Sequence, residues 1–130
     1  MIVEMTLSDL ENLNDKPIKE ELLSLGSNNP FAKFILYLNN DKIVGYLYYS
    51  DIYDRIEINE LLVFDSYRRK GYASKMLECL IKKHKDISLE VKCDNIGAIN
   101  LYQKYGFKKV AVRRGYYDGI DGNLMILEMK

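Results

Sequence analysis

Apolar and polar positions follow two different periods along this chain, and each period predicts a type of element. Short apolar runs at residues 2–5, 34–38 and 43–49 are typical of β-strands, and the polar residues 39–41 join the last two as a hairpin. Residues 55–64 predict another strand, which begins with alternation and ends in a continuous apolar run. Residues 7–25 predict one or two short helices, the first capped by Ser8 or Asp9 and the second opened by Pro17.

After Gly71 the apolar period becomes helical, because apolar residues recur at i, i+3, i+4, i+7 and i+8: Ala73, Met76, Leu77, Leu80 and Ile81. Residues 87–92 alternate strictly and predict a strand. Asp94 or Asn95 then caps a second helix, which ends at Gly106. Two final strands are expected at 107–112 and 124–129, around a loop rich in Gly and Asp. This order predicts a mixed α/β chain whose sheet is partly antiparallel.

Length and composition narrow the class of protein. A chain of 130 residues suits one domain, 1–130, and 48% apolar with 29% charged residues is an ordinary globular composition. The formal net charge of zero argues against nucleic acid or a membrane surface as partner. We expect a cytoplasmic protein, because the first residues lack a signal-peptide pattern and no apolar run approaches about 20 residues. Cys79 and Cys93 have no metal-ligand spacing, so free thiols and no metal are expected.

The zero net charge hides an asymmetry between the two halves. Residues 1–65 carry 5 Lys/Arg against 12 Asp/Glu, whereas residues 66–130 carry 14 against 7. Such a split indicates either that the second half meets an anion or that the two halves neutralise each other in the fold. The asymmetry alone does not choose between these explanations.

A basic loop between a strand and a helix is the most informative segment. Arg68, Arg69 and Lys70 precede Gly71 and Ala73, which stand where the helix begins. Backbone N–H groups at a helix N-terminus are unpaired and favour anions, and small residues allow a phosphate to approach the backbone. The spacing fits neither a Walker loop nor the G-x-G-x-x-G dinucleotide pattern.

Three motifs resemble one family. Arg68-x-x-Gly71-x-Ala73 resembles the pyrophosphate loop [RQ]-x-x-G-x-[GA] of the Gcn5-related N-acetyltransferases, the GNAT superfamily. Residues 89–107 are similar to its L-E-V-x-x-x-N-x-x-A-I-x-L-Y-x-x-x-G-F stretch. Residues 113–117 resemble the R-R-x-Y-Y signature of its protein-N-terminus branch. The closest likeness is to the ribosomal-protein-alanine (RimI-type) N-acetyltransferases, over residues 42–130 in order.

The resemblance implies a fold and an activity. The fold is a GNAT-like α+β domain with a twisted, mixed, mostly antiparallel sheet and helices on both faces. The activity is direct acetyl transfer from acetyl-CoA to an amine, with CoA as product, and the acceptor is a protein or peptide N-terminus. A small amine (polyamine, amino acid or aminoglycoside) as acceptor, or a non-catalytic acyl-CoA-binding module, is the alternative. The chain is expected to be a monomer or homodimer.

The resemblance also assigns roles to residues. It places Tyr102 as the general acid and Glu90 as the general base, with Glu60 on the neighbouring strand as a rival base. Arg113–Tyr117 marks the acceptor side, where Tyr116 or Tyr117 lines the slot. Lysines on the helix after Gly71 are candidates to face the 3′-phosphate. The residues expected to bind the cofactor are Leu61, Leu62, Val63, Arg68, Arg69, Lys70, Gly71, Tyr72, Ala73, Asn95 and Tyr102.

Overall fold

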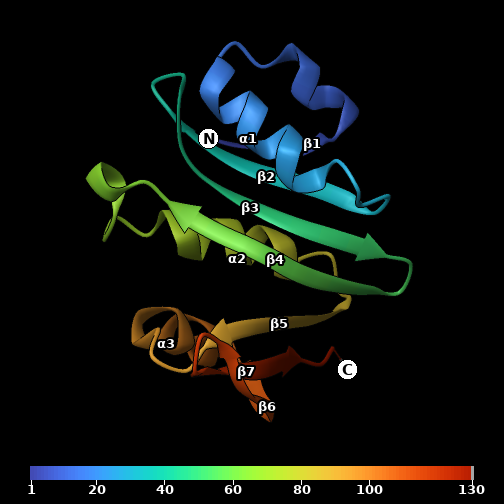
Figure 1. Ribbon diagram of the computed structural model, residues 1–130. Helices are drawn as coiled ribbons and strands as arrows, with labels where there is room; N and C mark the ends of the chain where they lie inside the picture. The colour runs from blue at the N-terminus through green and yellow to red at the C-terminus, as the bar shows by residue number, and fades with distance from the viewer. Residues whose placement is uncertain (130) are drawn as a thin grey trace.

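The computed structural model describes residues 1–129, which form a seven-stranded sheet with helices packed against it (Figure 1). The strands lie in the order β1-β2-β3-β4-β5-β7-β6. Their bounds, with those of the α-helices and the two 3₁₀ helices η1 and η2, are β1 (Ile2–Thr6), η1 (Ser8–Asn12), α1 (Lys16–Gly26), β2 (Ala32–Asn39), β3 (Lys42–Ile52), β4 (Arg55–Val63), η2 (Asp65–Tyr67), α2 (Tyr72–Ile81), β5 (Asp86–Lys92), α3 (Ile96–Lys104), β6 (Lys108–Tyr117) and β7 (Ile120–Leu127).

The sheet is mixed and mostly antiparallel, as predicted. Only β4 and β5 pair in parallel, and α2 makes the crossover between them. All other neighbouring strands pair antiparallel. The predicted order of elements is therefore confirmed, including the hairpin of β2 and β3.

Alternation along the central strands gives the sheet an apolar layer on each face. On β2, Phe34 and Leu36 pack with Leu22 of α1, whereas Ile35 packs on the other face with Leu77 of α2. The same second cluster includes Tyr102 of α3 and strand residues as far as β7. Helix α1 thus covers one face, and α2 and α3 cover the opposite face, as the helix-on-both-faces prediction requires.

The parallel pair β4–β5 separates partway along its length. Pairing runs only from Arg55 opposite Asp86 to Ile58 opposite Leu89. On its other side β4 stays paired with β3 as far as Val63, with a bulge where Tyr48 opposes Glu60 and Tyr49 opposes Ile58. A bulge bends the strand that carries the extra residue. Beyond Ile58, the backbone of β4 therefore faces a gap instead of a neighbouring strand.

Two local predictions were wrong. Helix η1 begins after Leu7 with no side-chain cap, because Asp9 instead accepts a hydrogen bond from the Thr6 N–H and donates its own N–H to the Thr6 hydroxyl. The second correction concerns the end of the chain, where β6 continues to Tyr117. Residues 113–117 are therefore strand and not loop, since they pair with the start of β7 across a bulge.

The predicted start of α1 is confirmed. Pro17 lies in its first turn, and the Asp15 carboxylate accepts a hydrogen bond from the Ile18 N–H at 3.2 Å.

Within residues 1–129, none of the helices is long and apolar enough to cross a membrane.

Candidate active site

Two cavities lie at the gap between β4 and β5, and both are lined by Leu61 of β4 and by residues of α3. The first, here called the loop cavity, has a volume of about 560 Å³ and lies between the end of β4, the basic loop, and helices α2 and α3. Its lining is formed by Leu61, Leu62, Val63, Tyr67, Arg68, Arg69, Gly71, Tyr72, Ala73, Ser74, Asn95, Gly97, Ala98, Leu101 and Tyr102.

The loop cavity has the start of α2 as one wall. Gly71 caps this helix with a φ of +80°, a conformation that glycine adopts at little cost, and no side chain caps the helix. The first N–H groups of α2 therefore have no side-chain acceptor. A Cβ at Gly71 would meet nothing within 4 Å, so there is open space beside this backbone. An anion can approach this helix start closely.

Arg68 holds the basic loop onto β4. Its Nε donates to the Val63 carbonyl at 3.0 Å, and its Nη2 lies 3.1 Å from Oδ1 of Asp65. Arg69 also lines the cavity and has a φ of +65°. Lys70 is exposed and does not line the cavity, so its charge acts there only from a distance.

The second cavity, here called the carboxylate cavity, has a volume of about 490 Å³ and contains both candidate bases. Glu60 and Glu90 line it from opposite sides of the gap, on β4 and β5. Asn59, Lys92 and Tyr117 line it as well. Two carboxylates beside apolar strand residues suit the binding of a cationic group such as an ammonium.

Tyr102 lies where the two cavities meet. It belongs to the lining of both, together with Leu61, Asn95 and Ala98. Its side chain is buried against Phe107, with ring centroids 5.4 Å apart. Burial raises the pKa of Tyr102 to about 12, so the phenol keeps its proton at neutral pH. Tyr102 therefore contributes a protonated phenol to the residues that line both cavities.

Glu90 is a partly buried carboxylate with an ion-pair partner on β6. Its side chain is only 18% exposed, and its Oε2 lies 3.3 Å from Nε of Arg113 on β6. Tyr117 lies beside it, and burial together with the Glu90 carboxylate raises the pKa of this phenol. Tyr117 lines the carboxylate cavity, whereas Tyr116 is 58% exposed. The structure therefore brings Tyr117, and not Tyr116, to the carboxylate cavity.

Asn95 performs the capping role expected from the sequence. Its Oδ1 accepts from the Ala98 N–H at 3.2 Å at the start of α3. Because Asn95 also lines both cavities, capping and ligand contact are compatible.

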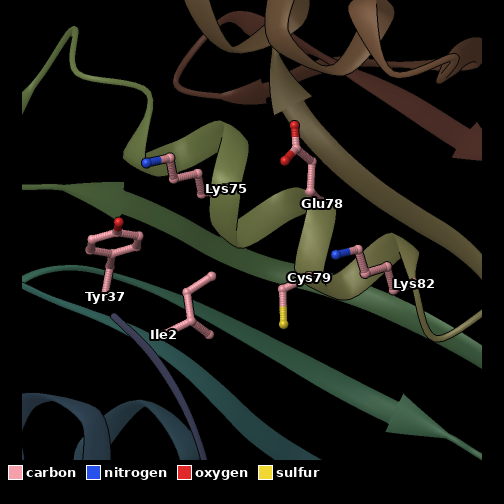
Figure 2. Close-up of a pocket in the computed structure, with 6 residues that line it drawn as sticks. All are labelled: Ile2, Tyr37, Lys75, Glu78, Cys79 and Lys82. Carbon is pink, nitrogen blue, oxygen red and sulfur yellow. The ribbon is translucent and has the colours of Figure 1, made fainter.

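The lysines that follow the basic loop are not brought to the loop cavity. Lys83 and Lys85 pair with Glu4 and Asp51, at 2.6 Å and 2.7 Å. Lys75 and Lys82 line a separate cavity of about 390 Å³ between α2 and the first two strands. In Figure 2, Cys79 points from α2 toward the strands while Glu78 points the opposite way.

Ten of the eleven residues predicted to bind the cofactor line the loop cavity, Lys70 being the exception. Sequence reasoning missed Tyr67, Ser74, Gly97, Ala98 and Leu101. Four of these five residues could have been predicted from their helical spacing relative to residues already assigned to the site. Ser74 lies in the first turn of α2, and residues 97, 98 and 101 lie on the turns of α3 next to Asn95 and Tyr102.

Comparison with known proteins agrees with this geometry. The model of the acetyltransferase (GNAT) family matches residues 2–107. The N-alpha-acetyltransferase of Saccharolobus solfataricus is 34% identical, over 85% of this chain and 84% of that protein. The [ribosomal protein bS18]-alanine N-acetyltransferase of Haemophilus ducreyi is 32% identical, over 74% of this chain and 71% of that protein.

The fold has a close counterpart among solved structures. The crystal structure of the ribosomal-protein-S18-alanine N-acetyltransferase from Escherichia coli superposes with a TM-score of 0.80. The match covers 100% of this chain and 94% of that one, at 23% identity. At this level of identity the superposition establishes the fold, while the relatives above 30% identity carry the family assignment.

Proposed function

This chain belongs to the acetyltransferase (GNAT) family and is an N-acetyltransferase, and we propose that its acceptor is the α-amine at the N-terminus of a protein or peptide. The relatives that share about a third of its sequence are named for this acceptor: one as an N-alpha-acetyltransferase and one as a ribosomal-protein alanine N-acetyltransferase.

The observation that carries the proposal is the meeting of two unlike cavities at Tyr102. The loop cavity offers a helix N-terminus, two arginines and the backbone of β4, which suit phosphates and an extended arm. The carboxylate cavity offers Glu60 and Glu90, which suit an ammonium group. Direct transfer between two bound substrates requires such a junction, because the acetyl donor and the amine must come into contact.

The chemistry of the loop cavity suits acetyl-CoA. Arg68, Arg69 and the N–H groups that follow Gly71 would hold the pyrophosphate, and the unpaired edge of residues 61–63 would hold the pantetheine arm. Tyr72, Ala73, Asn95 and Tyr102 complete the proposed cofactor-binding set. Lys70 adds positive charge beside it.

The proposed chemistry requires one proton acceptor and one proton donor from the chain. Acetyl-CoA supplies the acetyl group, and its thioester C–S bond breaks as the acceptor nitrogen forms the new C–N bond. The Glu90 carboxylate accepts a proton from the α-ammonium, directly or through water, which makes the nitrogen nucleophilic. The Tyr102 hydroxyl gives its proton to the departing sulfur, and the second proton that the nitrogen loses as the amide forms passes through water to restore the phenol. N–H groups of β4 that face the gap would hold the carbonyl oxygen.

Glu60 is the alternative base. It lines the same cavity from β4, next to the bulge in the pairing of β3 with β4. A comparison of Glu90→Gln with Glu60→Gln decides between them. The variant that removes the base lowers kcat by about 10² or more, whereas the other leaves most of kcat intact.

An assay of thiol release tests the proposed function. Purified protein is mixed with acetyl-CoA and a peptide that begins with Ala or Ser, and free CoA is measured with a thiol reagent. We expect release with the free peptide and none with the same peptide carrying a formyl group on its α-amine. A polyamine is tested in a parallel reaction as a small amine. Turnover of the polyamine with none of the peptide would favour the alternative acceptor class, and no binding of acetyl-CoA by calorimetry would overturn the enzyme assignment.

A further inference from the structure

The Glu90 carboxylate is enclosed by residues from three adjacent strands. Glu90 lies on β5, its ion-pair partner Arg113 lies on β6, and β7 runs between them. The register places Arg113 opposite Gly122 of β7, and Gly122 opposite Lys92 of β5. Arg113 therefore reaches across an entire strand to contact Glu90.

Gly122 makes this reach possible because it has no side chain. A Cβ at this position would lie 2.9 Å from Oε1 of Glu90 and 2.9 Å from Cε2 of Tyr117. Real Cβ atoms do not approach other atoms this closely, so any larger residue would displace the carboxylate or the ring. The glycine thus leaves space for the carboxylate between the guanidinium and the tyrosine.

Arg113 is itself held in place from the solvent side. Its guanidinium lies over the ring of Tyr116, 4.4 Å from the centroid, a distance at which a cation and an aromatic face attract each other. The Tyr116 ring in turn packs edge-on against Tyr117. The arginine therefore has one partner on each side, a carboxylate within the cavity and an aromatic face outside it.

We propose that Arg113 and Gly122 are positioning residues for Glu90, which hold its carboxylate at the rim of the carboxylate cavity in the orientation that accepts the acceptor's proton. Neither residue lines that cavity. They act on the reaction only through Glu90, so this inference rests on the proposed function and on Glu90 as base.

A double-mutant cycle tests the proposal, since it separates an effect that passes through Glu90 from an independent one. Peptide acetylation is measured for the wild type, Arg113→Gln, Glu90→Gln and the double variant. We expect Arg113→Gln to lower kcat about tenfold, because the Glu90 carboxylate loses its ion-pair partner, with little change in the KM for acetyl-CoA. In the Glu90→Gln background the same change should alter kcat by less than about twofold.

Lys109→Gln is the matched control. Lys109 lies on the same strand and also carries a positive charge, but it is exposed and lines neither cavity. It should keep nearly full activity. Gly122→Ala is a second, independent variant that crowds the carboxylate from the other side. The loss of kcat caused by Gly122→Ala should likewise disappear in the Glu90→Gln background. The thermal unfolding midpoint of Gly122→Ala, compared with that of the wild type, shows whether any loss of activity is due to misfolding.

Two results would overturn the proposal. One is a loss for Arg113→Gln that persists undiminished without Glu90, since Arg113 would then act by itself. The other is an unchanged kcat for Arg113→Gln when Glu90→Gln is strongly impaired. If the wild type acetylates no peptide, the proposed function fails first and this inference fails with it.

Discussion

At the scale of single residues, Tyr102 connects the two halves of the site. A buried tyrosine on the apolar face of a helix would ordinarily be a packing residue, and Tyr102 does pack against Phe107. Tyr102 differs from an ordinary packing residue because it also lines both cavities. One side chain can therefore contribute to the core through its ring and to the reaction through its hydroxyl.

Removal of that hydroxyl separates the two contributions. Tyr102→Phe keeps the ring and its packing, so we expect unfolding near the wild-type midpoint and little change in acetyl-CoA affinity by calorimetry. The loss of a general acid should lower kcat by about 10² or more. Steady-state kinetics with a saturating peptide measures this, and unchanged turnover would remove Tyr102 from the acid role.

The raised pKa of Tyr102 gives a second, spectroscopic prediction. An ordinary tyrosine has a pKa near 10 and is half ionised at that pH, whereas burial raises this phenol's pKa to about 12. The acid form is the one present below the pKa, so Tyr102 should stay protonated at pH 10. We expect the ultraviolet titrations of wild type and Tyr102→Phe to agree up to about pH 11. A difference with a midpoint near pH 10 would show an ordinary, solvated phenol.

Individual contacts were the part of the site that the sequence could not supply. Resemblance to the family's local motifs singled out Glu90 and Tyr102 as candidates, and periodicity placed one on a strand and the other on a helix. The contact of Glu90 with Arg113 depends on the register of β5, β7 and β6 and on the missing side chain of Gly122. The pattern within one strand or helix cannot predict a contact that reaches across an intervening strand.

At the scale of elements, the site is built where regular pairing stops. The parallel strands β4 and β5 separate after Ile58, and the two helices that follow them begin beside the gap. Periodicity predicted these elements well, since α2 and β5 have clear apolar patterns. The extent of β6 was missed because the exposed residues of an edge strand carry no apolar alternation, and its pairing with β7 is set by the chain's tertiary structure.

The cap of α3 offers a test at this scale. Asn95→Ala removes the acceptor for the Ala98 N–H, which should lower the free energy of unfolding by about 1 kcal/mol in denaturant titrations. Asn95→Asp is the matched variant, because it retains a capping oxygen while it places a negative charge in the wall of the loop cavity. It should keep its stability and bind acetyl-CoA more weakly. Equal stability of all three proteins would contradict the capping role.

At the scale of the whole molecule, the opposite charges of the two halves meet in the fold. Lys83 and Lys85 of the basic half pair with Glu4 and Asp51 of the acidic half. Arg68 and Arg69 remain at the loop cavity, where we propose that the anionic cofactor binds. Mutual neutralisation therefore explains the charges of Lys83 and Lys85, while an anionic partner remains our proposal for Arg68 and Arg69.

The ion pairs of Asp51 make the stability of the fold depend on pH. The Asp51 carboxylate receives Lys33 at 3.1 Å and Lys85 at 2.7 Å. Burial opposes its ionisation, but the hydrogen bonds of the two lysines outweigh that effect and lower its pKa below the ordinary 3.8. A carboxyl group with a lowered pKa in the folded state contributes stability at neutral pH and loses it as the pH falls below about 4.

We therefore expect Asp51→Asn to lower the free energy of unfolding by about 1–2 kcal/mol at pH 7, and the difference from wild type to shrink progressively as the pH falls below about 4. Denaturant titrations across this range measure it. Glu57→Gln is the control, because Glu57 belongs to an exposed pair with Arg55 at 3.9 Å and should change stability little. A difference for Asp51→Asn that stays constant with pH would contradict the electrostatic explanation.

The central claim is that this molecule places an acetyl group on a protein's α-amine. The most direct measurement is tandem mass spectrometry of one peptide that begins with Ala and also contains a lysine, after incubation with acetyl-CoA and the protein. The account predicts a single acetyl group on the α-nitrogen, and none when Tyr102→Phe replaces the wild type at the same concentration. An acetyl group found on the lysine side chain with a free α-amine, or an unmodified peptide alongside a turned-over polyamine, would contradict it.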